Sequence, residues 1–321
     1  MFAAGPARAQ YSSSQQSNSP VSASSSSSSS SASAPQKQPA PPKEPALVDP
    51  SGPDVSLQSS EALFDIAAAL NSCGYDAGLA ESDPLRTQIR GEIDQALLAS
   101  AEARDSHDKL CTFVDQHRLA DPSQDLAQYI SLALYTTLPP DLSPSAEEAD
   151  MPPDSTQVMD ILPLVRDFSA HVDLHLIWVE NRPAYDQLLA NLHTSLTRMI
   201  VQTNAYLKMP ASGFSGRRFL VVVEPLLDPT QTNARVYGTD YVVVASPTHG
   251  AIRMDDVRHT YLHYEIEPLL YAHSVAISRL QPFLKIVRDA PIDDSDRTDV
   301  VALVVECMIR AIEARTMNTG V

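Results

Sequence analysis

The sequence is poor in basic residues and has no long apolar run. Its 321 residues include 23 lysines and arginines against 40 aspartates and glutamates, which gives a net charge of −17. Because nucleic acids are bound by concentrated basic surfaces, we expect no nucleic-acid partner. A transmembrane helix needs about 18 or more consecutive apolar residues, and no such run occurs, so we expect no transmembrane span.

Cysteine is also scarce. Cys73, Cys111 and Cys307 are widely separated, odd in number and not part of any Cys-x-x-Cys pair. This spacing implies neither a zinc ribbon nor a disulfide framework. We therefore expect three buried thiols.

The first 55 residues have almost nothing to bury. They are rich in serine and proline and include the unbroken run from Ser24 to Ser31. Such a composition predicts a disordered segment over residues 1–55. Ala7-Arg8-Ala9 has the small-x-small shape of a signal-peptidase site, so we interpret the segment as carrying a signal-peptide remnant. This favours export to the periplasm or the extracellular space, with a cytoplasmic location left open.

Helical periodicity follows. Residues 56–140 predict a layer of about four amphipathic helices, which ends at Pro139-Pro140. An acidic, proline-rich loop separates this layer from a second long helical pattern, which we expect to be interrupted near Asn181-Arg182-Pro183. His171 and His175 lie four residues apart in this second pattern, and we assign them to a solvated or half-buried helix face rather than to a metal site.

The periodicity then changes to that of strands. Residues 218–225 predict a buried strand, and residues 234–237 and 241–245 predict a hairpin. Helices are expected over 257–271 and 299–315. The predicted fold is therefore α+β and mostly helical, with an N-terminal helical layer followed by a small sheet.

The helix predicted over 257–271 carries a histidine pair. His259 and His263 lie one turn apart on one helix face, which is the spacing that two imidazoles need to hold one metal ion. In the zinc-peptidase motif His-Glu-x-x-His, the residue after the first histidine is the glutamate that acts as general base. Thr260 occupies that position here.

Several segments together resemble the gluzincins, the thermolysin-like zinc metallopeptidases. The resemblance rests on a hairpin that ends in Tyr-Val-Val-Val-Ala-Ser-Pro, on the segment Val-Arg-His-Thr-Tyr-Leu-His-Tyr, and on a later helix that bears a glutamate. It covers residues 216–315 and implies that residues 155–321 form a zincin-like domain. By this resemblance zinc is the cofactor and the metal ligands are His259, His263 and Glu306.

Other charged residues near this motif have expected roles. Glu306 has an alternative partner in Arg310, one helical turn later. Glu267 lies about 10 Å along the helix from Thr260, too far to replace the base, but it can contact His263 and fix the ring. We expect Glu265 to point away into solvent.

The sequence thus predicts a degenerate, inactive zinc-metallopeptidase-like protein that retains metal or peptide binding. A peptide ligand would add to the edge strand of the sheet without being cut. Two alternatives remain open: an α-helical protein-interaction scaffold formed by residues 59–208, and an active metallopeptidase whose base comes from elsewhere. The oligomeric state is not fixed by the sequence.

Overall fold

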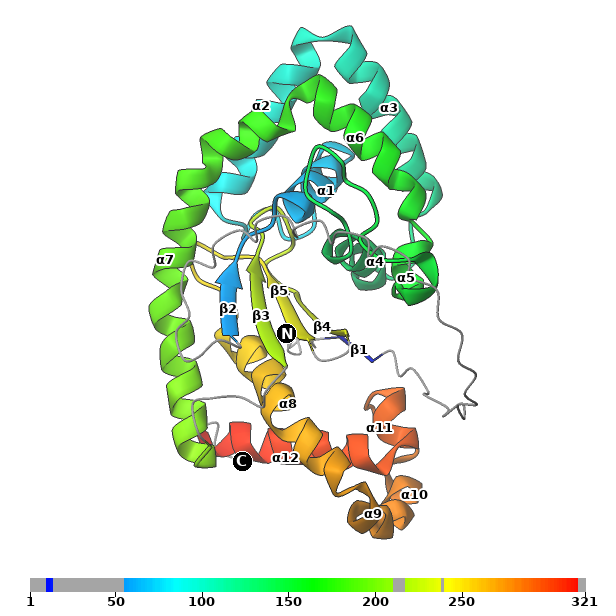
Figure 1. Cartoon of the computed structure of the whole chain (residues 1–321), viewed down its shortest axis with the longest axis vertical. Coiled ribbons are helices and arrows are strands. Elements are labelled where there is room, and N and C mark those ends of the chain that lie inside the picture. Colours follow the sequence, from blue (N-terminus) through cyan, green and yellow to red (C-terminus); the bar gives the residue numbers. More distant parts are fainter. Residues whose placement is uncertain (1–9, 14–54, 210–216, 238–239, 317–321) are drawn as a thin grey trace, which may run out of the picture.

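The computed structural model describes residues 10–13, 55–209, 217–237 and 240–316. Its architecture is α+β and mostly helical, which confirms the predicted fold class (Figure 1). Most of the segment that we predict to be disordered, residues 1–9 and 14–54, lies outside the described residues.

A mixed sheet lies in the middle of the molecule. Its strands are β1 (Gln10–Ser13), β2 (Val55–Gln58), β3 (Arg218–Val223), β4 (Thr232–Tyr237) and β5 (Asp240–Ala245). They lie in the order β1-β4-β5-β3-β2. The predicted hairpin is present as the antiparallel pair β4–β5, while β3 runs parallel to both β2 and β5. Strand β2 was not predicted, and it precedes the helical layer although its partner β3 follows that layer.

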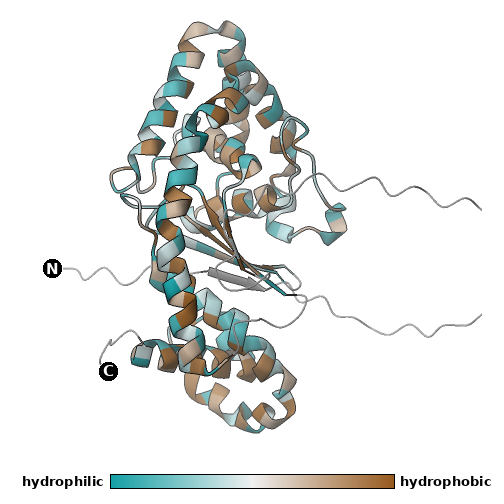
Figure 2. Ribbon diagram, turned by 60° about the vertical axis from the view of Figure 1, so that its left-hand side comes forward, coloured by the Kyte–Doolittle hydropathy of each residue, from teal (hydrophilic) through white to brown (hydrophobic). Residues whose placement is uncertain are grey.

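Both faces of the sheet are covered. Successive side chains of a strand point to opposite faces, and in β3 Val222 packs into one core while Val221 packs into another. In β5, Val242 and Val243 divide in the same way. The strands are accordingly apolar along much of their length (Figure 2).

The four helices predicted for the N-terminal layer are present at the upper end of the molecule in Figure 1, and their buried side chains share one core with one face of the sheet. These helices begin with N-cap residues: in the first and the fourth helix, the Ser60 and Asp121 side chains accept hydrogen bonds from backbone N–H groups of the first turn. The helices are α1 (Glu61–Ser72), α2 (Pro84–Ala99), α3 (Ala101–Gln116) and α4 (Pro122–Leu134).

The predicted interruption near Pro183 is wrong. Helix α6 (Leu162–Val172) ends at Asp173, which has a left-handed φ of 55°, and α7 (Leu174–Leu207) then continues through Pro183 without a break. A proline inside a helix costs about 3 kcal/mol. Trp178 and Tyr185, on either side of it, are both buried in the core, and we attribute the continuity to this packing.

Helix α8 (Met254–Ala272) covers the other face of the sheet and contains the histidine pair. Its buried Val257, Tyr261 and Tyr264 belong to the core on that face. A second set of α8 side chains, which includes Leu262 and Ile266, packs against α12 (Val300–Thr316). His259 and His263 lie beside this second set, on the side of α8 that faces α12.

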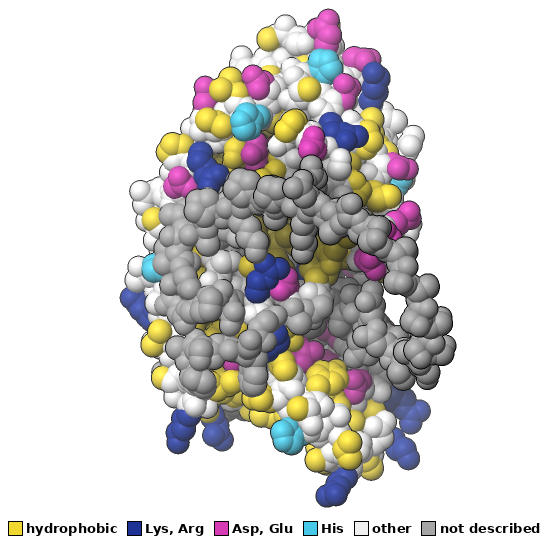
Figure 3. Space-filling view, viewed as in Figure 1, with side chains coloured by type: hydrophobic (Ala, Val, Ile, Leu, Met, Phe, Trp, Pro, Cys, Tyr) yellow, Lys and Arg dark blue, Asp and Glu magenta, His cyan; other side chains and the backbone are white. Residues whose placement is uncertain are grey.

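Short helices connect α8 to α12 and were not predicted. They project at one end of the molecule, the lower end in Figures 1 and 2. Apolar and basic side chains are exposed at this end (Figure 3). The segments are α9 (Ser274–Ile277), the 3-10 helix η3 (Ser278–Phe283), α10 (Leu284–Val287) and α11 (Asp294–Thr298). Elsewhere, short helices η1 (Glu148–Asp150), α5 (Pro153–Thr156) and η2 (Met159–Ile161) connect α4 to α6.

Two buried carboxyl groups lie where the helical layer meets the sheet. Glu224 is fully buried and accepts hydrogen bonds from the Tyr185 hydroxyl (2.8 Å) and the Leu226 N–H (3.0 Å). Burial raises the pKa of Glu224 to about 8. Burial also raises the pKa of Asp65, to about 7. Because burial disfavours the charged form, both groups bind protons more tightly in the folded state than in the unfolded chain.

We predict that the protein loses stability as the pH rises from 5 to 8. The folded-state pKa of Glu224 lies above its ordinary value of 4.5. The stability that this shift contributes is therefore fully present below pH 4.5 and is lost as the pH rises through about 8. Glu224→Gln should flatten this dependence, removing on the order of a few kcal/mol of pH-linked free energy. Urea unfolding at several pH values measures it, with exposed Glu180→Gln as the control. An unchanged pH slope in Glu224→Gln would contradict the prediction.

Candidate metal centre

The three predicted ligands lie together. The Nε2 atoms of His259 and His263 are each 3.6 Å from Oε2 of Glu306, and the three candidate ligand atoms lie within 4.8 Å of one another. A tetrahedral zinc ion with bonds of about 2.0–2.2 Å places neighbouring donor atoms about 3.4 Å apart. Two imidazoles and one carboxylate therefore have the composition and nearly the spacing of a zinc site with one open position.

Two helices build this arrangement. Helix α8 presents His259 and His263 one turn apart, with ring centroids 5.0 Å from each other, and α12 presents Glu306. The apolar contact between the helices, which includes Leu262 and Val305, fixes how closely the carboxylate approaches the rings. The side chains of the three ligands are only 12%, 10% and 23% exposed, so the donor atoms are largely withdrawn from solvent.

Each histidine also has a carboxylate on its other ring nitrogen. Nδ1 of His263 lies 3.5 Å from Oε2 of Glu267, where the sequence places that residue. Nδ1 of His259 lies 2.9 Å from Oε1 of Glu313, which the sequence reasoning missed. Glu313 follows Glu306 by seven residues, two turns along the same helix face, and that spacing could have identified it. Carboxylates in this position orient metal-bound imidazoles and increase their basicity.

The alternative partner of Glu306 is present as well. Arg310 donates from Nε to Oε1 of Glu306 (2.7 Å) and from Nη1 to Oε2 of Glu313 (3.1 Å). Because Arg310 uses Oε1 and the imidazoles face Oε2, the ion pair and the ligand role use different oxygens of the same carboxylate. The two interpretations of Glu306 are therefore compatible.

The charged side chains of the site shift the pKa values of their neighbours. Burial alone would raise the pKa of Glu306, but His263, His259 and Arg310 outweigh it and lower that pKa to about 2. For His263, burial alone would lower the pKa, but Glu267 and Glu306 outweigh it and raise the pKa above the ordinary value. Without a metal ion, the ionised carboxylate and the protonated imidazole stabilise each other.

The residue at the position of the catalytic glutamate, Thr260, is not accessible to solvent. Its hydroxyl donates to the backbone oxygen of Asp256 (3.2 Å). Glu265 does not point into solvent, so that expectation is wrong. It is 2% exposed and accepts a hydrogen bond from the Tyr261 hydroxyl (2.8 Å), because this side of α8 faces the molecule's interior.

A cavity of about 620 Å³ lies beside the three ligands. It extends between α8 and the segment that leads into α12, and much of its polar lining is acidic. Asp296 is half-buried there, and burial, with the nearby charge of Glu306, raises its pKa to about 6. The carboxylates lining the cavity are Glu267, Asp293, Asp296, Asp299 and Glu306.

The hairpin strand β4 is not an edge strand of the sheet. Strand β4 pairs on one side with β5 and on the other with β1, through the register Gln10–Asn233 to Ser13–Val236. A peptide could pair with β4 on that side only by displacing residues 10–13, and the edge strands of the described sheet are β1 and β2. Strand addition at an edge stays a prediction, and the cavity is a second place for a ligand.

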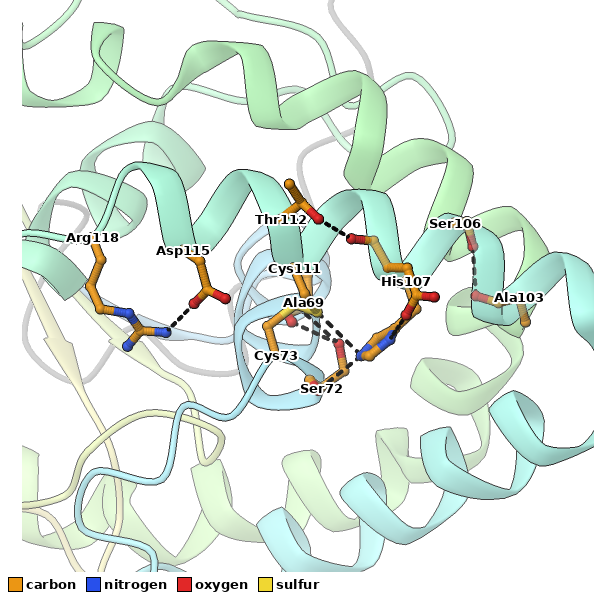
Figure 4. Close-up of a disulfide and its surroundings, with 11 residues drawn as sticks. Ala69, Ser72, Cys73, Ala103, Ser106, His107, Cys111, Thr112, Asp115 and Arg118 are labelled. Atoms are coloured by element: carbon orange, nitrogen blue, oxygen red, sulfur yellow. Dashed lines mark hydrogen bonds and ion pairs between the residues drawn. A yellow bond between two sulfur atoms is a disulfide. The ribbon is translucent and has the colours of Figure 1, made fainter.

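A second group of candidate ligands consists of Cys73, His107 and Cys111. The two cysteines form a disulfide that joins the end of α1 to α3, and Cys307 is exposed, so the expectation of three buried thiols is wrong. His107 lies beside the bond, with Nε2 3.2 Å from the Cys111 sulfur (Figure 4). Metal ions are bound by thiolates, and a disulfide offers none.

His171 and His175 do not belong to any group of candidate metal ligands among the described residues. His171 faces the backbone oxygen of Asp167, and His175 faces Glu61, with Nδ1 to Oε1 at 2.6 Å. These two histidines lie in different helices, α6 and α7, because the chain turns between them at Asp173.

No protein-family model, no curated protein and no solved structure matches this chain. The resemblance to gluzincins therefore stays a prediction. Within the described residues, no helix is long and apolar enough to cross a membrane.

In the metal-free protein, we expect His263 to titrate above the ordinary imidazole value of 6.5, because Glu267 and Glu306 favour its charged form. Glu306→Gln removes one of these charges and should lower the pKa of His263. NMR titration of the histidine ring protons measures both values, with His263→Ala to assign the signal. Since the folded-state pKa is raised, the linked stability is present below pH 6.5 and is lost as the pH rises through the folded-state pKa. A pKa at or below 6.5 would contradict the prediction.

Proposed function

We propose that this protein is a degenerate metallopeptidase-like protein that binds zinc through His259, His263 and Glu306 and does not cleave peptides. The observation that supports this most directly is the pair of 3.6 Å distances from the imidazole Nε2 atoms to Oε2 of Glu306. Metal-bound histidines almost always have a carboxylate, a backbone carbonyl or a water molecule at the other ring nitrogen, and Glu267 and Glu313 lie at that position here.

The residues have distinct roles in this proposal. Glu313 and Glu267 hold the two rings so that Nε2 faces Glu306, and Arg310 holds the remaining oxygen of that carboxylate. When bound, zinc polarises a carbonyl group or acidifies a water molecule. Cleavage also needs a group that accepts and returns a proton, and the Thr260 hydroxyl is buried and occupied with the Asp256 backbone oxygen. The cavity would thus hold a peptide as a ligand.

Export of the protein is part of the same proposal. Disulfides persist mainly in oxidising compartments, and Cys73–Cys111 favours such a location. The alternative of a helical scaffold has less support, because the buried apolar residues of α1 to α4 are used in one core with α6, α7 and the sheet.

We expect about one zinc ion per chain in the purified, dialysed protein, as measured by elemental mass spectrometry. His259→Ala/His263→Ala should lose it, and His171→Ala/His175→Ala, which removes the other histidine pair, should retain it. Glu313→Ala should weaken zinc binding by about 10–100-fold, since it removes the carboxylate that orients His259. Equal zinc content in the two double variants would contradict the assignment.

One observation favours a second candidate function, an active hydrolase in which Asp296 is the base. Asp296 lines the same cavity, and its pKa of about 6 is close to that of an effective base at neutral pH. In this case the zinc-loaded protein would cleave peptides, and Asp296→Asn would lower the rate by about 10²–10⁴-fold while retaining zinc.

A mixed peptide library analysed by mass spectrometry separates the two functions. Asp293→Asn, at an exposed residue of the same cavity, is the matched control. We expect no cleavage by the wild-type protein at any zinc concentration. Cleavage that Asp296→Asn abolishes and Asp293→Asn spares would replace the first proposal with the second.

A further inference from the structure

The segment that projects beyond α8 differs in charge from the rest of the chain. The chain contains 40 acidic residues, but residues 268–288 contain none. The lysine and arginine residues of this segment are Arg279, Lys285 and Arg288, and all three are exposed. The charged side chains of this segment are therefore all basic, on a protein whose net charge is −17.

The same segment exposes large apolar side chains. Val275 is 86% exposed, Ile286 is 75% exposed and Phe283 is 52% exposed. Among the described residues, five of the thirteen exposed large apolar side chains come from residues 269–286, so the exposure is concentrated there. The five are Leu269, Val275, Leu280, Phe283 and Ile286.

The segment lies at one end of the molecule. Helices α9 and α10 and the 3-10 helix η3 form the end of the molecule that is farthest from the N-terminal helical layer (Figures 1 and 2). Apolar and basic side chains are seen side by side at this end (Figure 3). A projecting end can enter an interface without bringing the acidic remainder of the protein into contact with it.

We propose that residues 268–288 dock the protein on the surface of an anionic lipid bilayer. Val275, Phe283 and Ile286 enter the boundary between headgroups and acyl chains, and the three cations contact lipid phosphates. The segment lies on the membrane and does not span it, in keeping with the short helices that form it.

A bilayer fits these observations better than an acidic protein partner does. An acidic protein surface would match the cations but would leave the exposed apolar side chains without an apolar environment, whereas a lipid interface provides both. Repulsion between the membrane and the protein's acidic remainder is limited, because charges more than about 10 Å apart are largely screened at moderate salt concentration. The inference does not depend on the metal site.

The test is flotation of the full-length protein with lipid vesicles. We expect binding to vesicles of phosphatidylcholine mixed with phosphatidylglycerol, little binding to vesicles of phosphatidylcholine alone, and a decrease with added salt. Val275→Ser/Ile286→Ser should weaken binding by about tenfold or more, because it removes apolar groups from the interface. Arg279→Gln/Lys285→Gln should weaken it by about 25-fold, or about fivefold for each cation removed.

Matched variants elsewhere on the surface are the controls. Leu98→Ser/Val201→Ser removes two other exposed apolar side chains, which are 73% and 55% exposed. Arg198→Gln/Arg315→Gln removes two other exposed cations. Both control variants should bind vesicles as the wild-type protein does, and thermal unfolding should confirm that all four variants are folded.

Three outcomes would overturn the inference. One is equal binding to neutral and anionic vesicles, and another is an equal loss of binding in segment and control variants. The third is self-association in sedimentation velocity that Val275→Ser/Ile286→Ser abolishes, without vesicle binding by the wild-type protein. That result would assign the surface to a second copy of the chain.

Discussion

The contact between α8 and α12 is the constraint on which the candidate site depends. Apolar side chains such as Leu262 and Ile309 hold the two helices together, and the histidines of one helix then face the glutamates of the other. Charged groups that are withdrawn from water cost several kcal/mol each unless they are paired. Each charged member of the site has such a partner, because Arg310 joins Glu306 to Glu313 and each glutamate faces a histidine.

The ion pairs of this network hold the candidate ligand side chains in place. A small zinc-dependent domain unfolds without its metal because the ligands have nothing else to hold them. Here Glu306 keeps an ion pair with Arg310 through one oxygen, whether or not the other contacts a metal. The imidazoles have carboxylate neighbours on both sides. The three candidate donor atoms are therefore held in place by the protein's own contacts.

The sequence predicted those features that depend on local periodicity. The four N-terminal helices, the β4–β5 hairpin and the one-turn spacing of His259 and His263 follow from apolar patterns, caps and turns. The pairing of Cys73 with Cys111, the burial of Glu265 and the continuity of α7 through Pro183 depend on contacts between distant segments, and all three were predicted wrongly. Glu313 is an intermediate case, because its two-turn spacing from Glu306 was visible but its contact with His259 was not.

The placement of β2 has a consequence for how the chain folds. Val55 pairs with Phe219, and the four helices of the N-terminal layer lie between them in sequence. During synthesis, β2 emerges long before its partner strand, so its apolar residues Val55 and Leu57 have no sheet to join until β3 has been made. Pairing over so long a separation is slow, because a large loop must close before the contact forms. The addition of β2 to the sheet is thus a slow step, whereas β3, β4 and β5 lie within residues 218–245 and can pair with one another before β2 joins them.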